Sequence, residues 1–498
     1  MIAGRGNVEG PRSFFTGLAI LKRASWRSLS MNRIGVLAVG ILLSAPLWAS
    51  AKTLYVDGST GSDSTSYAAN GPSTPWRTIG RAAWGNASRS APNSSEAARA
   101  GDTVSIVAGT YSSSLNIGGG RWLVLYDTVN DGTAGNPIVF LATGVVRIQA
   151  RYWYGPVIGA SEKDYIHWTG PFYLDEADIL THADTGPVVL HDSTGSGIDG
   201  ATIHGAGATW ADNHTGVRFE ACNRCFVRNA RIDNFKSLQG ATSRNGAGVM
   251  LYDSDDTIIE RNEIFDCGSG VYIKGAFVPP QERTIVRFNL IHDMLSQGVI
   301  VQVTQDGRVY QNIIRDNPAG IVFNAADVSP GAYPTNDIVA NNTLDGNDAP
   351  VIYNTDLLEN VRFWNNIVTN SPTAQYSDVQ ASPGDVELDR NVYFGIPSGT
   401  FARFTQGAYT FSAWRSTFLQ DAHSIVGDPM YVNSGSDDFR LSPSSPVRNL
   451  GIDILDLDGD GSTTDPINPG AYVSGSESIG PGPVDPPSVP TRVRVIRP

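Results

Sequence analysis

"ERNEIFD" (residues 260–266) is the first of six segments in which an asparagine is followed two residues later by an apolar residue. The others are "RFNLIHD" (287–293), "YQNIIRD" (310–316), "ANNTLDG" (340–346), "WNNIVTN" (364–370) and "DRNVYFG" (389–395). Their asparagines, Asn262, Asn289, Asn312, Asn342, Asn366 and Asn391, are separated by 27, 23, 30, 24 and 25 residues. A period in this range is typical of a solenoid.

The residues between these segments predict strands rather than helices. They form short alternating apolar runs bounded by Gly, Asn and Asp. In a parallel β-helix, each coil passes through two or three strands and stacks about 4.8 Å from the next coil. An asparagine at one turn tolerates the left-handed conformation and can hydrogen-bond a neighbouring coil. We therefore predict an all-β, right-handed parallel β-helix of about ten coils, with the asparagines as a structural ladder.

The two ends of the β-helix should be capped, because open strand edges promote aggregation. "STPWRTIGRAAWGNA" (73–87) has apolar residues at helical spacing and predicts a short N-terminal capping helix. Beyond residue 475 the chain is rich in Gly and Pro and has no core pattern. We predict the β-helix domain at 52–475 and a flexible tail at 476–498.

The start of the chain has the pattern of an export signal. "MNR" (31–33) precedes an apolar run at 34–48, and "ASA" (49–51) is typical of a signal-peptidase site. We predict that residues 1–51 are a signal peptide with an upstream extension. The apolar run is too short to span a bilayer. The protein is therefore expected to be secreted, extracellular or periplasmic, without a membrane span, and monomeric.

Charge and cysteine content exclude some classes of protein. The net charge is −13, and removal of residues 1–51, with six basic and one acidic side chain, changes it to −18. A charge of this sign argues against nucleic acid as a partner. No second cysteine pair accompanies Cys222-x-x-Cys225 to complete a zinc site, and no βαβ pattern surrounds it. With Cys267, these cysteines are predicted to be buried thiols or to form one disulfide.

Both ends of the predicted domain resemble a known group of proteins. "TLYVDGSTGSDSTSYAANGPSTPWRTIGRAA" (53–83) and "RAGDTVSIVAGTY" (99–111) resemble the opening of secreted right-handed parallel β-helix proteins of the pectate-lyase-like superfamily. "DFRLSPSSPVRNLGID" (438–453) is similar to their usual end. The resemblance implies the fold and export. It does not fix the reaction, since the superfamily includes polysaccharide lyases, glycoside hydrolases, epimerases and members without known activity.

Five strands align on a leading glycine: "GVRFE" (216–220), "GVMLY" (248–252), "GVYIK" (270–274), "GVIVQ" (298–302) and "GIVFN" (320–324). Their second and fourth residues are apolar and should face the core, so that the third and fifth face outward. The fifth position gives an outward ladder of Glu220, Tyr252, Lys274, Gln302 and Asn324, with a less certain extension to His191 and Asn354. The third position places Arg218, Met250 and Tyr272 beside it. Lys274 should therefore be exposed on a sheet face.

Lys274 is one of only four lysines after residue 51 and is similar to the catalytic base of family 9 polysaccharide lyases. β-Elimination removes the proton α to a sugar carboxylate, so that the carboxylate must be neutralised and the base unprotonated. We predict Lys274 as the base and Tyr252 as the proton donor to the leaving oxygen. Arg218, Arg244 or Ca²⁺ would hold the carboxylate. Glu220, Gln302, Asn324 and Tyr272 would contact an acidic polysaccharide.

Family 9 lyases bind Ca²⁺ through aspartates upstream of the lysine, and Asp253, Asp255 and Asp256 are the candidates here. "DLDGDGSTTD" (456–465) resembles the first half of a calcium loop, but Ile467 at the twelfth position argues against an EF-hand. Three readings remain open beside this site. In the first, Lys274 pairs with Glu220 or Tyr252 in a soluble face; in the second, the protein binds carbohydrate without catalysis; in the third, Glu220 joins Asp253 or Asp255 as the carboxylate pair of a glycoside hydrolase.

Overall fold

The computed structural model describes residues 51–113, 122–150, 153, 155–179, 185–207, 212–275, 280–324, 333–355, 357–377 and 386–482. All of them belong to one compact unit, which begins at Ser50. Residues 1–50 of the predicted signal peptide and residues 483–498 of the predicted tail lie outside the described residues. Within the described part of the chain, none of the helices has the length and apolarity needed to cross a membrane.

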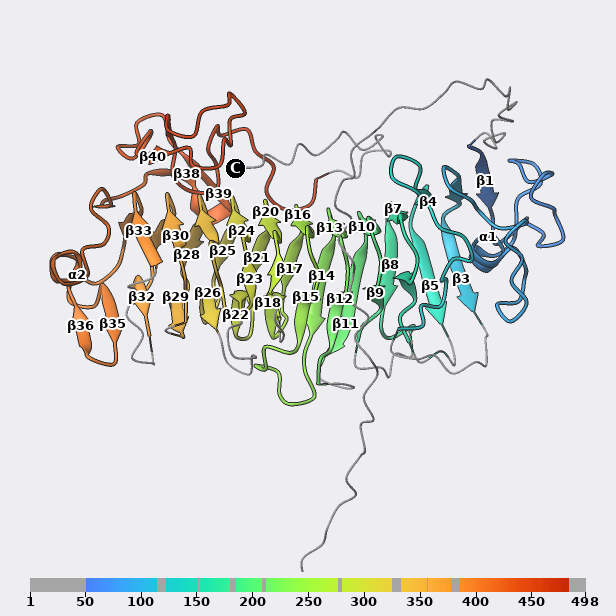
Figure 1. Cartoon of the computed structure of the whole chain (residues 1–498), viewed down its shortest axis with the longest axis horizontal. Coiled ribbons are helices and arrows are strands. Elements are labelled where there is room, and N and C mark those ends of the chain that lie inside the picture. Colours follow the sequence, from blue (N-terminus) through green and yellow to red (C-terminus); the bar gives the residue numbers. More distant parts are fainter. Residues whose placement is uncertain are drawn as a thin grey trace, which may run out of the picture. The chain divides into compact units, whose positions relative to one another are not determined.

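Three long sheets run through the described residues (Figure 1). The first sheet comprises β1 (Thr53–Val56), β2 (Thr103–Ile106), β4 (Ile138–Ala142), β7 (Ile166–Thr169), β10 (Gly197–Asp199), β13 (Phe226–Arg228), β16 (Ile258–Glu260), β20 (Ile285–Arg287), β24 (Arg308–Tyr310), β27 (Ile338–Ala340), β30 (Val361–Trp364) and β33 (Val386–Asp389). The second sheet comprises β3 (Gly109–Ser113), β5 (Val146–Ala150), β8 (Phe172–Asp175), β11 (Thr202–Gly207), β14 (Arg231–Phe235), β17 (Glu263–Phe265), β21 (Leu290–His292), β25 (Ile313–Arg315), β28 (Thr343–Asp345), β31 (Ile367–Thr369), β34 (Val392–Phe394) and β37 (Ile425–Val426).

The third sheet comprises β6 (Ile158–Ser161), β9 (Val188–His191), β12 (Thr215–Glu220), β15 (Ala247–Tyr252), β18 (Ser269–Ile273), β22 (Gln297–Val301), β26 (Ala319–Asn324), β29 (Ala349–Asn354), β32 (Gln375–Tyr376), β35 (Ala402–Phe404) and β36 (Gly407–Tyr409). Short two-stranded pairs are β19 (Gln281–Glu282) with β23 (Thr304–Gln305), β38 (Tyr431–Asn433) with β39 (Asp438–Leu441), and β40 (Gly451–Ile452) with β41 (Pro466–Ile467).

Neighbours in each long sheet come from successive coils and pair in parallel, apart from the closing β35–β36 pair. The predicted parallel β-helix is therefore confirmed. The described first and second sheets each contain 12 strands, so that the expectation of about ten coils was slightly low. The core between the sheets is lined by stacked apolar side chains, as in the row Val217, Val249, Val271, Val299 and Ile321, all of which are 0% exposed.

The predicted asparagine ladder is present and continuous. Each ladder asparagine before the last donates its side-chain N–H to Oδ1 of the asparagine in the next coil, over 3.0 Å from Asn262 to Asn289 and 2.9 Å from Asn312 to Asn342, and the last, Asn391, donates to Asp421 over 3.1 Å. The same Oδ1 atoms also accept the backbone N–H of the preceding asparagine, as in Asn289 N to Asn312 Oδ1 at 3.0 Å. The ladder thus satisfies buried polar groups of adjacent coils and fixes their register.

The expected left-handed conformation occurs one residue earlier than predicted. Arg261, Phe288, Gln311, Asn341 and Asn365, which precede ladder asparagines, have φ between 53° and 57°. These residues form the bend between a strand of the first sheet and the next strand, in the second sheet. The asparagine is therefore required for its hydrogen bonds rather than for its tolerance of positive φ.

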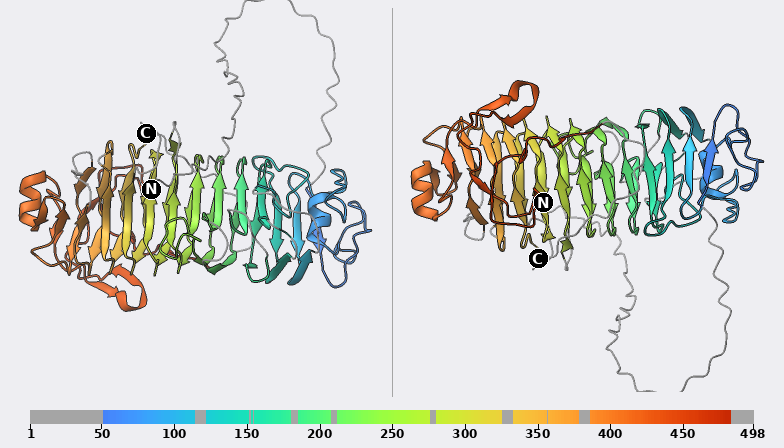
Figure 2. Two further views of the ribbon diagram at one scale, coloured as in Figure 1. Left: turned by 90° about the horizontal axis from the view of Figure 1, so that it is seen from below. Right: turned by 90° about the horizontal axis from the view of Figure 1, so that it is seen from above.

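Capping takes place at both ends of the β-helix (Figure 2). The predicted N-terminal helix is α1 (Ile79–Trp84), which begins at the N-cap Thr78 and ends at Gly85 with φ 68°, and all of its residues are buried. At the other end lies α2 (Phe411–Phe418), which the sequence analysis did not predict. Its Trp414 is 0% exposed and donates Nε1–H to the buried Asp421 over 2.9 Å. Each helix covers apolar residues of a terminal coil that would otherwise face water.

The C-terminal segment, residues 431–482, returns along the outward face of the second sheet (Figures 1 and 2). Asn365 donates to the carbonyl of Ile452 over 2.7 Å, and the N–H of Ala471 donates to Thr343 over 3.1 Å. Further back, the N–H of Gly480 donates to the carbonyl of Phe288 over 2.8 Å. The part of the predicted tail that the structure describes, 476–482, therefore contacts the β-helix.

The three cysteines are free and buried. Cys222 and Cys225 donate their thiols to the carbonyls of Leu190 and Ser193, over 3.0 and 3.3 Å. Burial raises the pKa of Cys267 to about 12, so that this thiol stays neutral. Of the two alternatives expected from the sequence, the structure has the buried thiols and not the disulfide.

Asp337 makes the stability of the fold sensitive to pH. Its buried carboxylate accepts from Thr304 Oγ1 and, over 2.6 Å, from the N–H of Gly307, and burial raises its pKa from 3.8 to about 6. The folded state then binds more protons than the unfolded state in this window, so that stability falls as pH rises through it. Between pH 4 and 7, the unfolding free energy of the wild type should fall by about 2–3 kcal/mol relative to Asp337→Asn, measured by denaturant titration.

Asp438→Asn is the matched control for this prediction. The hydrogen bond from Arg440 lowers the pKa of Asp438, so that its contribution should grow as pH rises, opposite in sign to that of Asp337. A wild-type curve parallel to that of Asp337→Asn would contradict the prediction.

Candidate functional site

The predicted outward ladder of the third sheet is in register. β9, β12 and β15 pair His191 with Glu220 and Glu220 with Tyr252, and β26 and β29 pair Asn324 with Asn354. Lys274 follows β18 directly, and its backbone N–H donates to the carbonyl of Leu251 over 2.9 Å. The alignment on leading glycines therefore placed these residues correctly in adjacent coils.

The exposure of this face was predicted wrongly. Arg218, Met250 and Tyr272 are each 0% exposed, while Gln302 and Asn324 are 2% exposed. Lys274 and Tyr252 are half-buried. On the outward side of the sheet, Ala247, Met250, Tyr272 and Ile300 of adjacent strands form a buried apolar cluster, and Trp122, from outside the sheet, packs against Arg218 and His191. The site is thus a partly covered, low-dielectric surface rather than an open solvated face.

Lys274 is held by two asparagines from the two preceding coils. Its Nζ donates to Oδ1 of Asn213 and to Oδ1 of Asn245, each over 3.0 Å. The same Nζ lies 5.3 Å from the ring centroid of Tyr252 and 5.5 Å from that of Tyr272. Two hydrogen bonds and two ring contacts therefore hold the amine in one place between the aromatic rings.

Tyr252 shares an acceptor with Lys274. Its hydroxyl donates to Oδ1 of Asn213 over 3.3 Å, which is the atom that also accepts from Lys274. The predicted proton donor and the predicted base are therefore brought together on one amide oxygen. A basic amine and a phenol that share an acceptor can remove a proton from one atom of a ligand and give a proton to an atom close by.

Arg218 does not have the role that the sequence suggested. Its fully buried guanidinium forms an ion pair with Glu220, with Nη2 2.7 Å from Oε2. It also lies 4.4 Å from the ring centroid of Tyr252 and 5.3 Å from that of Trp122. Arg218 therefore supports the Tyr252 ring and neutralises Glu220 from beneath, and it cannot reach a substrate carboxylate in this structure.

The remaining predicted binding residues divide into covered and accessible groups. The buried Tyr272 donates its hydroxyl to Gln302, so that these two side chains form part of the wall. Arg244 is half-exposed, and its guanidinium carbon lies 5.8 Å from the ring centroid of Tyr272. Of the two arginines predicted to hold a carboxylate, Arg244 is the accessible one.

The three aspartates predicted to bind calcium do not form a metal site. Asp256 pairs with Arg283, with Nε 2.6 Å and Nη2 3.0 Å from its two carboxylate oxygens. Asp255 accepts the backbone N–H of Glu282 over 2.7 Å. Neither they nor Asp253 belong to a convergent acidic group among the described residues. The residues present therefore do not fit the calcium cluster that the family resemblance implies.

Convergent carboxylates occur instead in the loop 453–465. Asp453, Asp458 and Asp465 form one group, and Asp456, Asp458 and Asp460 form another, with oxygens within 4.8 Å of one another. Asp453 accepts the N–H groups of Leu457 and Asp458 over 2.7 and 3.2 Å. These oxygens thus shape the loop, and the loop belongs to the C-terminal segment rather than to the third sheet.

Asp253, beside the site, is a titratable group with a shifted pKa. Burial, then the charge of Glu220, then that of Asp255, raise the pKa of this carboxyl. Glu220 is ion-paired with Arg218, so that the two acids have different surroundings. Two neighbouring carboxyls in different surroundings are the arrangement that acid and base roles require.

Sequence analysis missed three residues of the site: Trp122, Asn213 and Asn245. The two asparagines lie three residues before the leading glycines Gly216 and Gly248, so that a longer alignment of the coils would have found them. Trp122 stacks on His191 with ring centroids 4.4 Å apart and an interplanar angle of 9°. No periodic signal connects it to the third sheet, because it lies outside the repeated strands.

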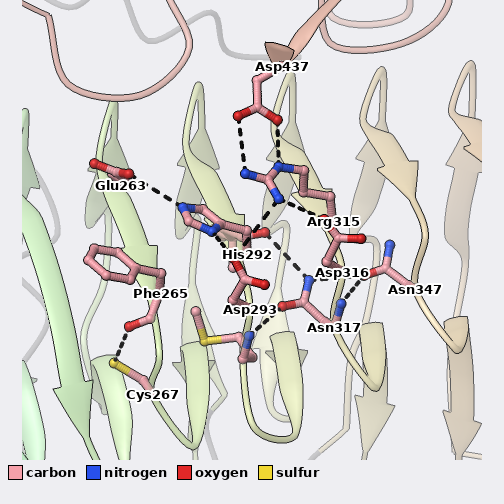
Figure 3. A network of polar contacts seen from close by, with 12 residues as sticks. Glu263, Phe265, Cys267, His292, Asp293, Arg315, Asp316, Asn317, Asn347 and Asp437 are labelled. Carbon is pink, nitrogen blue, oxygen red and sulfur yellow. Dashed lines mark hydrogen bonds and ion pairs between the residues drawn. The ribbon is translucent and has the colours of Figure 1, made fainter. Parts of the chain in front are cut away.

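A second polar network lies on the second sheet (Figure 3). His292 is 8% exposed, with Nδ1 2.6 Å from Asp293 and Nε2 3.4 Å from Glu263. Arg315 pairs with Asp316 and with Asp437 of the C-terminal segment, each at 2.6 Å. This network joins the C-terminal segment to the coils, and it shares no residue with the Lys274 site.

Known proteins were compared with this chain. Residues 215–392 match the family model described as "Right handed beta helix region". A protein of Bacillus subtilis (strain 168), "Uncharacterized protein YwoF", is 24% identical over 431 residues, covering 72% of this chain and 88% of that protein. The chain has the right-handed parallel β-helix fold. This confirms the resemblance that the repeats and the two ends of the domain carry.

Among solved structures, pectate lyase Pel9A is 13% identical with a TM-score of 0.50, covering 85% of this chain and 96% of that one. XylC in complex with xylose is 14% identical with a TM-score of 0.43, covering 76% and 87%. At such identities the likeness concerns the fold alone, and function must be argued from the site.

Proposed function

We propose that this protein is a secreted polysaccharide lyase that cleaves a uronate-containing polysaccharide by β-elimination. The observation that carries the proposal is the shared acceptor: Lys274 Nζ and the Tyr252 hydroxyl both donate to Asn213 Oδ1, over 3.0 and 3.3 Å. One amide oxygen thus sets a base and an acid side by side. Secretion rests on the export pattern in residues 31–51.

In the proposed reaction, Lys274 takes the proton at C5, which is α to the sugar carboxylate. The electron pair forms the C4–C5 double bond, the bond from C4 to the leaving oxygen breaks, and Tyr252 gives that oxygen its proton. A neutral amine has two N–H bonds, and Asn213 and Asn245 can accept both. The lone pair of the amine is then the base, with its direction set by the two asparagines.

The carboxylate of the substrate must lose part of its negative charge before C5 becomes acidic. Arg244 supplies a guanidinium at the accessible side of Tyr272, and a guanidinium can bind a carboxylate through two parallel hydrogen bonds. A calcium ion could serve the same purpose in a lyase, but no step is assigned to it here because the aspartate trio does not converge.

Arg244→Ala is expected to lower kcat/KM by about 10- to 100-fold, since a hydrogen bond to a charged group is worth about 1.5–3 kcal/mol. Initial rates on an acidic polysaccharide and on its carboxyl-esterified form measure the effect, which should vanish on the ester. Arg261→Ala is the matched control, because Arg261 also lies over an aromatic ring, 4.6 Å from the centroid of Phe288, but in the turns that follow β16 and β20. Equal losses in both variants would contradict a role in carboxylate binding.

The direct test of the function is a panel of pectate, alginate and glycosaminoglycans, with and without a calcium chelator. β-Elimination leaves an unsaturated uronate that absorbs in the ultraviolet, whereas hydrolysis produces reducing ends without this absorbance. New absorbance supports the lyase, and its loss with chelator would reveal a calcium requirement. Binding of a polysaccharide without any product would favour the non-catalytic carbohydrate-binding alternative.

A glycoside hydrolase remains the second candidate because of Asp253. Burial and the charge of Glu220 raise the pKa of Asp253, and a raised pKa is expected of a general acid. On this alternative, Glu220→Gln and Asp253→Asn would abolish the release of reducing ends. On the lyase proposal, Lys274 variants lose the ultraviolet product while Asp253→Asn retains it.

A further inference from the structure

A buried histidine and glutamate lie directly behind the Lys274 site. His214 is 1% exposed, and its Nε2 lies 2.7 and 2.9 Å from the two carboxylate oxygens of Glu176, whose side chain is 0% exposed. Nδ1 of His214 lies 3.0 Å from the carbonyl oxygen of Lys236. Glu176 follows β8, His214 precedes β12 and Lys236 follows β14. The pair therefore ties three separate segments of chain together.

The contacts of the ring indicate its protonation state. A carbonyl oxygen and an ionised carboxylate can only accept hydrogen bonds, so that both ring nitrogens must donate. His214 is then an imidazolium paired with the Glu176 carboxylate. Burial lowers the pKa of His214, but the hydrogen bond and charge of Glu176 outweigh it, and the net shift is upward. A buried ion pair of this kind adds little net stability, but it defines geometry.

His214 is joined to the site on both sides. It is the neighbour in sequence of Asn213, whose Oδ1 accepts from Lys274 and Tyr252. Its own carbonyl accepts the N–H of Ala247 over 3.1 Å, which anchors the next coil two residues after Asn245. Asn213 is thus bonded directly to His214, and Asn245 lies two residues before Ala247, which the His214 carbonyl holds.

We propose that His214 and Glu176 are positioning residues of the reaction, which act through Asn213 and Asn245 on Lys274 and Tyr252. The inference rests on the proposed function for the reaction itself. A displaced base costs rate rather than affinity, because the reacting atoms must meet within a fraction of an ångström.

Glu176→Gln, which keeps the shape and removes the charge, should lower kcat at least about tenfold and change KM less than about twofold. His214→Gln should do the same and gives a second variant if one fails to fold. Glu263→Gln is the matched control, because Glu263 also pairs with a buried histidine, His292, but in the second sheet (Figure 3). A similar loss of kcat in the control would show a general structural effect and overturn the proposal.

A double-mutant cycle tests the route through Asn213. If the ion pair acts by holding Asn213, Glu176→Gln should cause little further loss of kcat in an Asn213→Ala background. Independent, multiplying losses would overturn this route.

An NMR readout separates this proposal from the proposed function. The chain has five lysines, so that selective ¹³C-lysine labelling gives few signals, and Lys274 is assigned by its loss in Lys274→Arg. The Lys274 ε-methylene signal should move in Glu176→Gln and stay in place in Glu263→Gln. An unmoved signal in Glu176→Gln overturns the positioning role whether or not any substrate is cleaved. If the Lys274 signal moves in Glu176→Gln but the wild type cleaves no substrate, only the proposed lyase activity is refuted.

Discussion

Lys274→Ala is expected to lower the kcat of an active preparation by roughly 10²–10⁴-fold, the contribution of a general base. The loss should appear in kcat more than in KM, since the amine acts on the proton at C5 in the transition state. Lys274→Arg should fail as well, because a guanidinium does not release its proton. Initial rates of ultraviolet product formation at saturating substrate measure both variants.

Lys163→Ala is the control for this prediction, since Lys163 is also partly buried, with a side chain 26% exposed, beside Asp131. Its kcat should stay within about twofold of the wild type, because a substitution away from the site acts on stability alone. Lys274→Ala should cost about 1–2 kcal/mol of stability, since Asn213 and Asn245 each lose a donor. Near wild-type turnover in Lys274→Ala would move the search for the base to Tyr252 and then to His191.

Asn312→Ala is expected to have the largest effect on stability. Asn312 is 0% exposed, and its Nδ2 donates to Val286 O and Asn342 Oδ1, each over 2.9 Å. Its Oδ1 accepts from the backbone and the side chain of Asn289, each over 3.0 Å. Alanine would leave these buried groups unpaired at about 1–3 kcal/mol each, so that a loss of at least about 3 kcal/mol is expected.

Denaturant titration followed by circular dichroism measures this loss. Asn433→Ala is the matched control, because Asn433 is exposed and its amide donates only to Ser436, over 3.2 Å. The control should change stability by less than about 0.5 kcal/mol. If Asn312→Ala lost no more stability than the control, the asparagine ladder would not be a source of the stability of the fold.

The coil repeat could be predicted from the sequence because its cause is local and periodic. Asn262, Asn289 and Asn312 recur once per coil since each must reach the next, and the glycine-led strands keep the same faces in and out. Two parts of the fold have no such period. The helix α2 has one buried residue, Trp414, and the C-terminal segment contacts coils that lie more than a hundred positions earlier in the chain.

The site could be predicted only as far as strand register determines it. Register placed Glu220, Tyr252 and Lys274 in adjacent coils, but the burial of Arg218 depends on Trp122, which lies outside the repeat. Asp256 does not converge with Asp253 and Asp255 because its ion-pair partner, Arg283, comes from the next coil, and no local sequence pattern indicates this pair. The repeat predicts which residues share a face, but it does not predict which side chains from outside the repeat cover that face.

The returning C-terminal segment changes how this solenoid should unfold. Coils that touch only their neighbours can fray one at a time from an end. Here, hydrogen bonds join Asn341 to Asn468, Thr343 to Ala471 and Gln311 to Ala471, over 127, 128 and 160 positions of sequence. The coils from Phe288 to Asn391 cannot unfold separately until the C-terminal segment is released. These coils should therefore unfold as one cooperative unit. Because closing such long loops is slow, docking of the C-terminal segment should be the last step of folding.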